Sequence, residues 1–189
     1  EDEHPNKWVR QTALRMLGDR RDGSVVPVLQ QILARRTGQA ALDALWALHL
    51  SGGLNSATAQ RLLDHDDPYV RLWTVRLLAD DGVVTAEEAG QLQKRAAVEA
   101  HVETRSQLAS SARRLPASQG LPIVRQLAAR SADVEDAHVP LLLWWAIETH
   151  AEAHRELVLE LFRDPDFWNQ PLVEKHLLER LMRRYAQAG

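Results

Sequence analysis

The feature that most constrains this sequence is a helical pattern that repeats about every 30 residues. Apolar residues recur at spacings of three and four, as on one face of a helix, and Val70, Leu77 and Leu78 are one example. Glycine, proline and acidic residues interrupt these runs every 12 to 18 residues, for example at residues 66–68. Sustained strand alternation does not occur. The pattern therefore predicts an all-α protein.

The same interruptions divide the chain into about eleven predicted helices. They span residues 6–18, 24–36, 38–51, 55–64, 67–80, 85–98, 101–115, 117–130, 137–150, 151–163 and 171–187. Ser24 precedes an apolar run and is a candidate start. Thr85 is followed three residues later by Glu88, which predicts a capping box. Asp67 stands directly before Pro68, which predicts a capped helix that begins at the proline.

Every second predicted helix belongs to one repeating unit. Shifting residues 4–19 forward by 61 places Arg10 on Arg71, and a further shift of 34 places Arg71 on Arg105. These aligned helices begin near residues 6, 38, 67, 101, 137 and 171, at spacings of 29 to 36. A two-helix unit of this length is typical of α-solenoids. We therefore predict one right-handed α-solenoid domain over residues 1–189, with its helices in five to six antiparallel pairs.

The repeating unit resembles a HEAT repeat. Asp67 leads a helix and is followed by Val70 and Arg71, as in that family, and Asn6, Val9 and Arg10 keep the pattern. The resemblance implies a HEAT-like, ARM-like fold in which the Asp and Arg of neighbouring repeats pair along the stack. The departures are Thr104 in place of Val, and Ala44 and Leu143 in place of Arg. We therefore expect an interrupted series of such pairs.

A longer resemblance covers most of the chain. Residues 67–78, 107–116 and 140–146 look like the HEAT-repeat segment of planctomycete-type, haem-binding, membrane-bound dehydrogenase-like proteins of bacteria. Those proteins carry a β-propeller before this segment and a c-type haem domain after it, and this sequence contains neither. The resemblance implies an exported or periplasmic parent and a docking or linking role, and it transfers no catalytic residue. Because the chain begins at Glu1 without Met, we also expect a fragment of a larger multidomain protein.

The amino-acid composition excludes several classes of cofactor and partner. The absence of cysteine excludes disulfides, cysteine-ligated metals and thiol catalysis. The 23 Lys and Arg residues against 26 Asp and Glu residues give a net charge of −3, which argues against a dedicated nucleic-acid binder. No apolar run approaches 18 residues, so we expect no membrane insertion by this segment. The expected partners are flanking domains of the same parent protein or another protein.

The aligned helices also place residues of one kind in columns. A polar column contains Arg15, His49, Arg76, Ser110 and Glu148, and we expect it to face water on a concave surface. A neighbouring tryptophan column contains Trp46, Trp73 and Trp145. Each indole could fill the gap between repeats with its N–H bonded locally, which we favour, or could stack on a peptide, a sugar or bases. These eight residues form the predicted binding surface.

Other candidate sites have simpler explanations. His150 and His154 have the four-residue spacing of zinc ligands, but a helix boundary is expected between them, and we interpret them as surface histidines. The acidic run at residues 64–67 lacks the spaced ligands of a calcium loop and is interpreted as a capping turn. We therefore expect no catalytic residue, no metal and no cofactor. The predicted function is a non-catalytic scaffold; the alternative is a nucleic-acid-binding HEAT protein of the DNA glycosylase type, which needs a cationic groove.

Overall fold

The computed structural model describes residues 5–188, so Glu1–His4 and Gly189 lie outside the described residues. Within the described range the chain forms twelve α-helices with short 3₁₀ and π turns, and it contains no strand there. The all-α class predicted from the sequence is therefore confirmed. The chain divides into two compact units, residues 1–77 and residues 78–189, which we describe separately.

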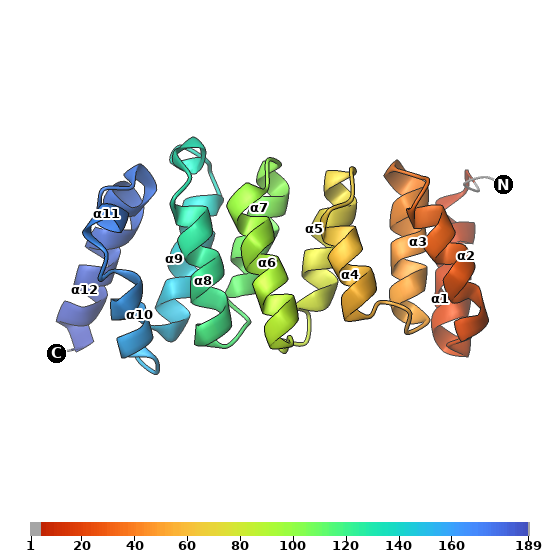
Figure 1. Ribbon diagram of the computed structural model, residues 1–189, viewed down its shortest axis with the longest axis horizontal. Coiled ribbons are helices and arrows are strands. Elements are labelled where there is room, and N and C mark those ends of the chain that lie inside the picture. Colours follow the sequence, from red (N-terminus) through yellow and green to blue (C-terminus); the bar gives the residue numbers. More distant parts are fainter. Residues whose placement is uncertain (1–4, 189) are drawn as a thin grey trace. The chain divides into compact units, whose positions relative to one another are not determined.

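The first unit is built around the third helix. Its helices are α1 (Lys7–Arg20), α2 (Val26–Leu33), α3 (Gly38–Leu50), α4 (Ser56–Leu63) and α5 (Pro68–Leu78), which reaches the boundary of the unit (Figure 1). Both α1 and α2 pack against α3. One apolar cluster joins α2 through α5 and includes Leu33, Leu45, Leu48, Leu62 and Val70. None of the fourteen described residues of α1 is buried, so this helix contributes little to the core.

The second unit consists of two layers of helices. Its helices are α6 (Ala86–Val98), α7 (Val102–Ala112), α8 (Ala117–Ala128), α9 (Val139–His150), α10 (Arg155–Leu161), α11 (Pro165–Trp168) and α12 (Leu178–Ala188). In one layer α8 packs against both α6 and α10, and in the other α9 packs against α7 and α12. The layers meet where α8 contacts α7 and α9, and Figure 1 shows α8 in front of α9. The aligned helices of this unit are thus α7, α9 and α12.

A glycine allows the two layers of the second unit to approach closely. A Cβ atom added to Gly120 of α8 would lie 2.3 Å from the carbonyl oxygen of Ala112, at the end of α7. That distance is far shorter than any van der Waals contact, and the obstacle is backbone. Only glycine therefore fits at this crossing.

The predicted helix starts agree with the structure at two of three positions. Thr85 and Glu88 form the capping box, since each backbone N–H is bonded to the other side chain. Asp67 caps α5 by accepting the backbone N–H of Tyr69 at 2.8 Å. Ser24 is not the cap, because Asp22 accepts the N–H of Ser24 at 2.9 Å and a 3₁₀ turn begins first.

The main differences from the predicted helices lie near the C-terminus. We expected a break between residues 163 and 171, but Asp164 caps the short helix α11 there. Four residues are too few to show a helical period, so only the Asp-Pro pair signals this helix. The last predicted helix contains a π turn at Val173–Leu177 before α12 begins. The other ten predicted helices all have counterparts, with bounds shifted by a few residues.

Candidate binding surface

The arginines that the repeat aligns make the same local contact. Each guanidinium donates to the carbonyl oxygen five residues earlier: Arg10 to Pro5 at 3.3 Å, Arg71 to Asp66 at 3.1 Å, and Arg105 to Ala100 at 2.6 Å. Arg71 and Arg105 also bind the carbonyl six residues earlier, at 2.7 and 3.2 Å. The contact recurs at the shifts of 61 and 34 read from the sequence. These arginines therefore hold the loop that leads into each helix.

In each unit an acidic side chain from a later segment pairs with one of these arginines, from α3 in the first unit and from the 3₁₀ turn Ser131–Asp133 in the second. In the first unit, Asp43 on α3 lies 3.0 Å from the guanidinium of Arg10 on α1. In the second, Asp133 binds Arg105 through both carboxylate oxygens, at 2.5 and 2.6 Å, and both side chains are buried. Removing one partner of such a buried pair is strongly destabilising, because it leaves an uncompensated buried charge.

Asp67 makes a further connection in the first unit. Its carboxylate accepts the N–H of Gly38, where α3 begins, at 2.6 Å, in addition to capping α5. Burial alone would raise the pKa of Asp67, but these backbone N–H groups hold the pKa below its usual range. His65 extends the connection, since its Nδ1 accepts the N–H of Asp67 and its Nε2 lies 2.9 Å from the carbonyl of Leu33. Residues 64–67 are thus the capping turn that the sequence predicts.

The polar column lies at the surface in both units. Arg15, His49 and Arg76 are exposed in the first unit; Glu148 is exposed and Ser110 half-buried in the second. The position directly before each of them is buried in the last four copies, as Leu48, Val75, Ala109 and Ile147. In these aligned helices a polar residue at the surface therefore directly follows a buried apolar residue, as the repeat predicts.

Two members of the tryptophan column pack together in the first unit. The rings of Trp46 and Trp73 meet edge to face, with centroids 5.0 Å apart and planes at 82°. Trp73 packs against the apolar cluster, and the guanidinium of Arg76 lies 5.2 Å from its ring centroid. The indole N–H of Trp46 is buried and meets no acceptor among the described residues. The local hydrogen bond that we expected for the packing interpretation is therefore not made at Trp46.

Trp145 in the second unit departs further from the packing interpretation. Its side chain is 39% exposed, and it is the adjacent Trp144 that is buried. The guanidinium of Arg113 lies 5.9 Å from the ring centroid of Trp145, within cation–π range, and is held there by Thr149 at 3.3 Å. With Glu148 exposed beside it, this group combines an aromatic face with charges of both signs.

The histidine pair differs from the prediction in one respect. The expected boundary is present, because α9 ends at His150 and α10 begins after His154. His150 is however buried and not a surface residue, since it continues the buried stripe of Leu143 and Ile147 at helical spacing. Burial lowers the pKa of His150, and His154, whose ring centroid is 5.7 Å away, lowers it further. Within the described part of the chain, no three His, Asp or Glu residues gather as metal ligands would.

The second unit also contains a cavity that the sequence pattern does not predict. It lies between α8 and α10, in the layer opposite the aligned helices, and is lined in part by Leu121, Pro122 and Leu157. The one signal in the sequence is Pro122, which stands inside an otherwise regular helical run.

Comparison with known proteins gives no match, whether to a protein family, to a curated protein or to a solved structure. The kinship with the dehydrogenase-associated HEAT segment therefore stays a prediction from the residues themselves. Among the helices of the described part, none is both long and apolar enough to cross a membrane.

Proposed function

We propose that this chain is a non-catalytic HEAT-type scaffold, a right-handed α-solenoid that docks or links protein segments along its aligned helices. The observation that supports the proposal best is the polar column, whose members lie at the surface and, in the last four copies, directly follow buried apolar residues. A column repeats its chemistry at each step of a stack, so it can bind an extended ligand at several points. The recurring arginine contact at the predicted shifts supports the repeat itself.

The chemistry of the column favours a polypeptide as the ligand. Arg15 and Arg76 of the first unit are positive and Glu148 of the second is negative, so the column is not the uniformly cationic surface that binds a polyanion best. The exposed face of Trp145 adds an aromatic contact, which is a common anchor in protein interfaces. In the parent protein that the sequence resembles, the bound segment would belong to a flanking domain or to a second protein of a haem-containing dehydrogenase-like assembly.

A peptide-display selection on the whole chain tests the proposal. Random peptides selected for binding are measured by fluorescence anisotropy against the wild type, Arg76→Glu and Glu148→Arg. We expect each substitution to lower the affinity of the selected peptides by about tenfold or more, which is the effect of losing roughly one charged contact. Thermal unfolding should hardly change, because surface substitutions usually stay within about 0.5 kcal/mol.

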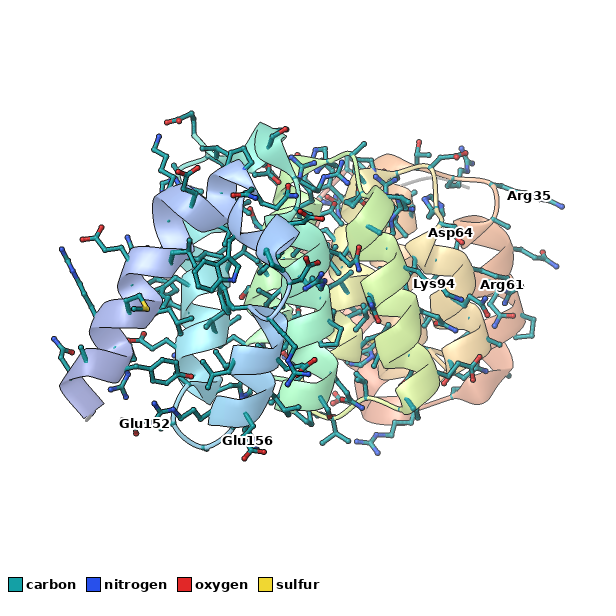
Figure 2. The ribbon with its side chains drawn as sticks, turned by 60° about the vertical axis from the view of Figure 1, so that its left-hand side comes forward. Arg35, Arg61, Asp64, Lys94, Glu152 and Glu156 are labelled. Carbon is teal, nitrogen blue, oxygen red and sulfur yellow. The ribbon has the colours of Figure 1, made fainter. Side chains whose placement is uncertain are left out.

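Arg35→Glu is the matched control. Arg35 is also an exposed arginine of the first unit, and Figure 2 shows its side chain extending away from the helices into solvent. Because Arg35 lies outside the polar column, this variant should bind the selected peptides as the wild type does. Equal losses in Arg35→Glu and Arg76→Glu would contradict the proposal. Salt-sensitive binding of a short DNA duplex, with no selectable peptide, would instead support the nucleic-acid alternative.

A further inference from the structure

The cavity of the second unit has the size of a small-molecule site. Its volume is about 580 Å³, inside the range of roughly 300–1,000 Å³ that is usual for ligand pockets. Its apolar wall consists of Leu121 and Pro122 from α8 and of Leu157 and Leu161 from α10. Leu157 is 43% exposed, so this wall is open to solvent.

The charged groups at the rim are already paired with each other. Arg125 donates to the carboxylate of Asp164 at 2.6 Å and to the carbonyl of Leu161 at 3.1 Å, and its guanidinium lies 4.9 Å from the ring centroid of Phe167. Arg163 pairs with Glu160. The rim thus has no net charge. An ionised ligand would therefore have to compete with an existing partner at the rim, whereas an uncharged ligand would not.

Pro122 leaves a hydrogen-bond acceptor at the cavity wall. Proline has no N–H, so Pro122 cannot make the usual helical hydrogen bond to the carbonyl of Ser118 four residues earlier. Ser118 and Pro122 both line the cavity. A ligand that carries a hydroxyl or amide N–H can donate to this carbonyl, and the amide of Gln93 adds a second polar group nearby.

We propose that this cavity binds an uncharged amphiphile, with its apolar body against Leu121, Pro122 and Leu157 and a hydrogen-bond donor at the carbonyl of Ser118. This site goes beyond the scaffold function, because α8 and α10 form the layer opposite the aligned helices. If no amphiphile binds in this cavity, the scaffold proposal is unaffected.

Four probes that share an octyl chain test the ligand class: 1-octanol, octyl methyl ether, octanoate and octylammonium. Each is titrated into the whole chain and followed by NMR chemical-shift changes of the residues around the cavity. We expect saturable binding of octanol, with the ether about tenfold weaker because it has no donor, and the two ions weaker still. Tighter binding of either ion than of octanol, or no saturable binding of octanol, would overturn the proposal.

Two leucines of one helix give a matched pair of variants. Leu157 and Leu159 are 43% and 46% exposed on α10, but only Leu157 lines the cavity. Leu157→Lys should lower the affinity for octanol by about tenfold or more, because it places a charge on the apolar wall. Leu159→Lys should leave the affinity for octanol unchanged. Equal losses in both variants would show that octanol binds exposed leucines nonspecifically.

Pro122→Ala tests the acceptor separately. Alanine restores the backbone N–H, which then bonds the carbonyl of Ser118 within α8. Both probes should lose the apolar contact of the proline ring, and octanol should in addition lose its advantage over the ether. An unchanged preference for octanol would show that the donor binds elsewhere and would contradict the proposed geometry. Circular dichroism and thermal unfolding verify that each variant is folded.

Discussion

The two units differ in how they use burial and charge. In the first unit, α1 has no buried residue among its described positions, whereas α8 of the second unit buries seven of twelve. Residues 1–77 carry ten Lys and Arg against nine Asp and Glu, and residues 78–189 carry thirteen against seventeen. The second unit buries the side chains of Glu99, Arg105 and Asp133, whereas the first unit buries that of Asp67. One repeat pattern thus gives a nearly neutral unit with a loosely covered first helix and an acidic unit that is well packed.

The difference illustrates a general property of stacked helices. Each helix of a repeat is covered on two sides only when it has a neighbour on each side. In the second unit, α8 contacts α6, α7, α9 and α10, while in the first unit α1 packs mainly against α3. The same amphipathic sequence pattern therefore yields different stability at different positions.

The largest expected effect is the loss of the buried ion pair in the second unit. Asp133→Ala leaves Arg105 buried without its carboxylate, and we expect the free energy of unfolding to fall by about 3–5 kcal/mol. Urea unfolding followed by circular dichroism measures this loss. The control is Asp80→Ala, because Asp80 pairs with Arg114 at 3.0 Å but is 58% exposed and should cost less than about 1 kcal/mol. Similar losses would mean that burial does not distinguish the two pairs.

Substitution of one tryptophan in each unit should give smaller losses of stability, and these losses should differ between the units. Trp73→Ala should destabilise the first unit by about 3 kcal/mol, the lower end for a large aromatic, since Trp73 is only half-buried. Trp145→Ala should cost about 1 kcal/mol or less, because that ring is 39% exposed. The same urea titration measures both. A stable Trp73→Ala protein that no longer binds the selected peptides would identify the tryptophans as the binding site instead.

Native-state hydrogen exchange should separate the units directly. We expect the amides of α1 to exchange faster than those of α5 and α8, because local opening of α1 exposes little buried surface. Mass spectrometry of peptic fragments resolves these segments. Protection of α1 as strong as that of α5 would contradict the picture of a loosely covered first helix.

The smallest expected effect is a pH dependence confined to the second unit. The pKa of His150 is lowered in the fold, so the unfolded chain binds more protons there. The contribution of neutral His150 to the free energy of unfolding should therefore be fully present above the unfolded pKa of about 6.5. It should be lost as the pH falls through the lower pKa of His150 in the folded protein. His150→Gln should flatten this decline, measured by thermal unfolding across pH 5 to 8. His154→Gln should retain it, because burial of His150 is the larger cause.

The sequence predicted the helices well because their signals are local. Thr85 with Glu88, and Asp67 with Pro68, mark helix starts through bonds between residues close in the chain, and both starts are confirmed. The polar column also follows from local periodicity, and its exposure agrees with the alignment of Leu48, Val75 and Ile147 in the core. Whether that column binds a partner remains a proposal.

The sequence by itself thus determined the all-α class, most helix bounds and the polar side of each aligned helix. Only the tertiary structure decided that Trp145 is exposed, that His150 is buried and that a cavity lies beside Pro122. The physical reason is that periodicity shows which side of a helix is apolar, but a neighbouring helix decides whether that side is covered. Leu157 of α10, for example, lies on the wall of the cavity and is 43% exposed, because the neighbouring helices cover that side of α10 only in part.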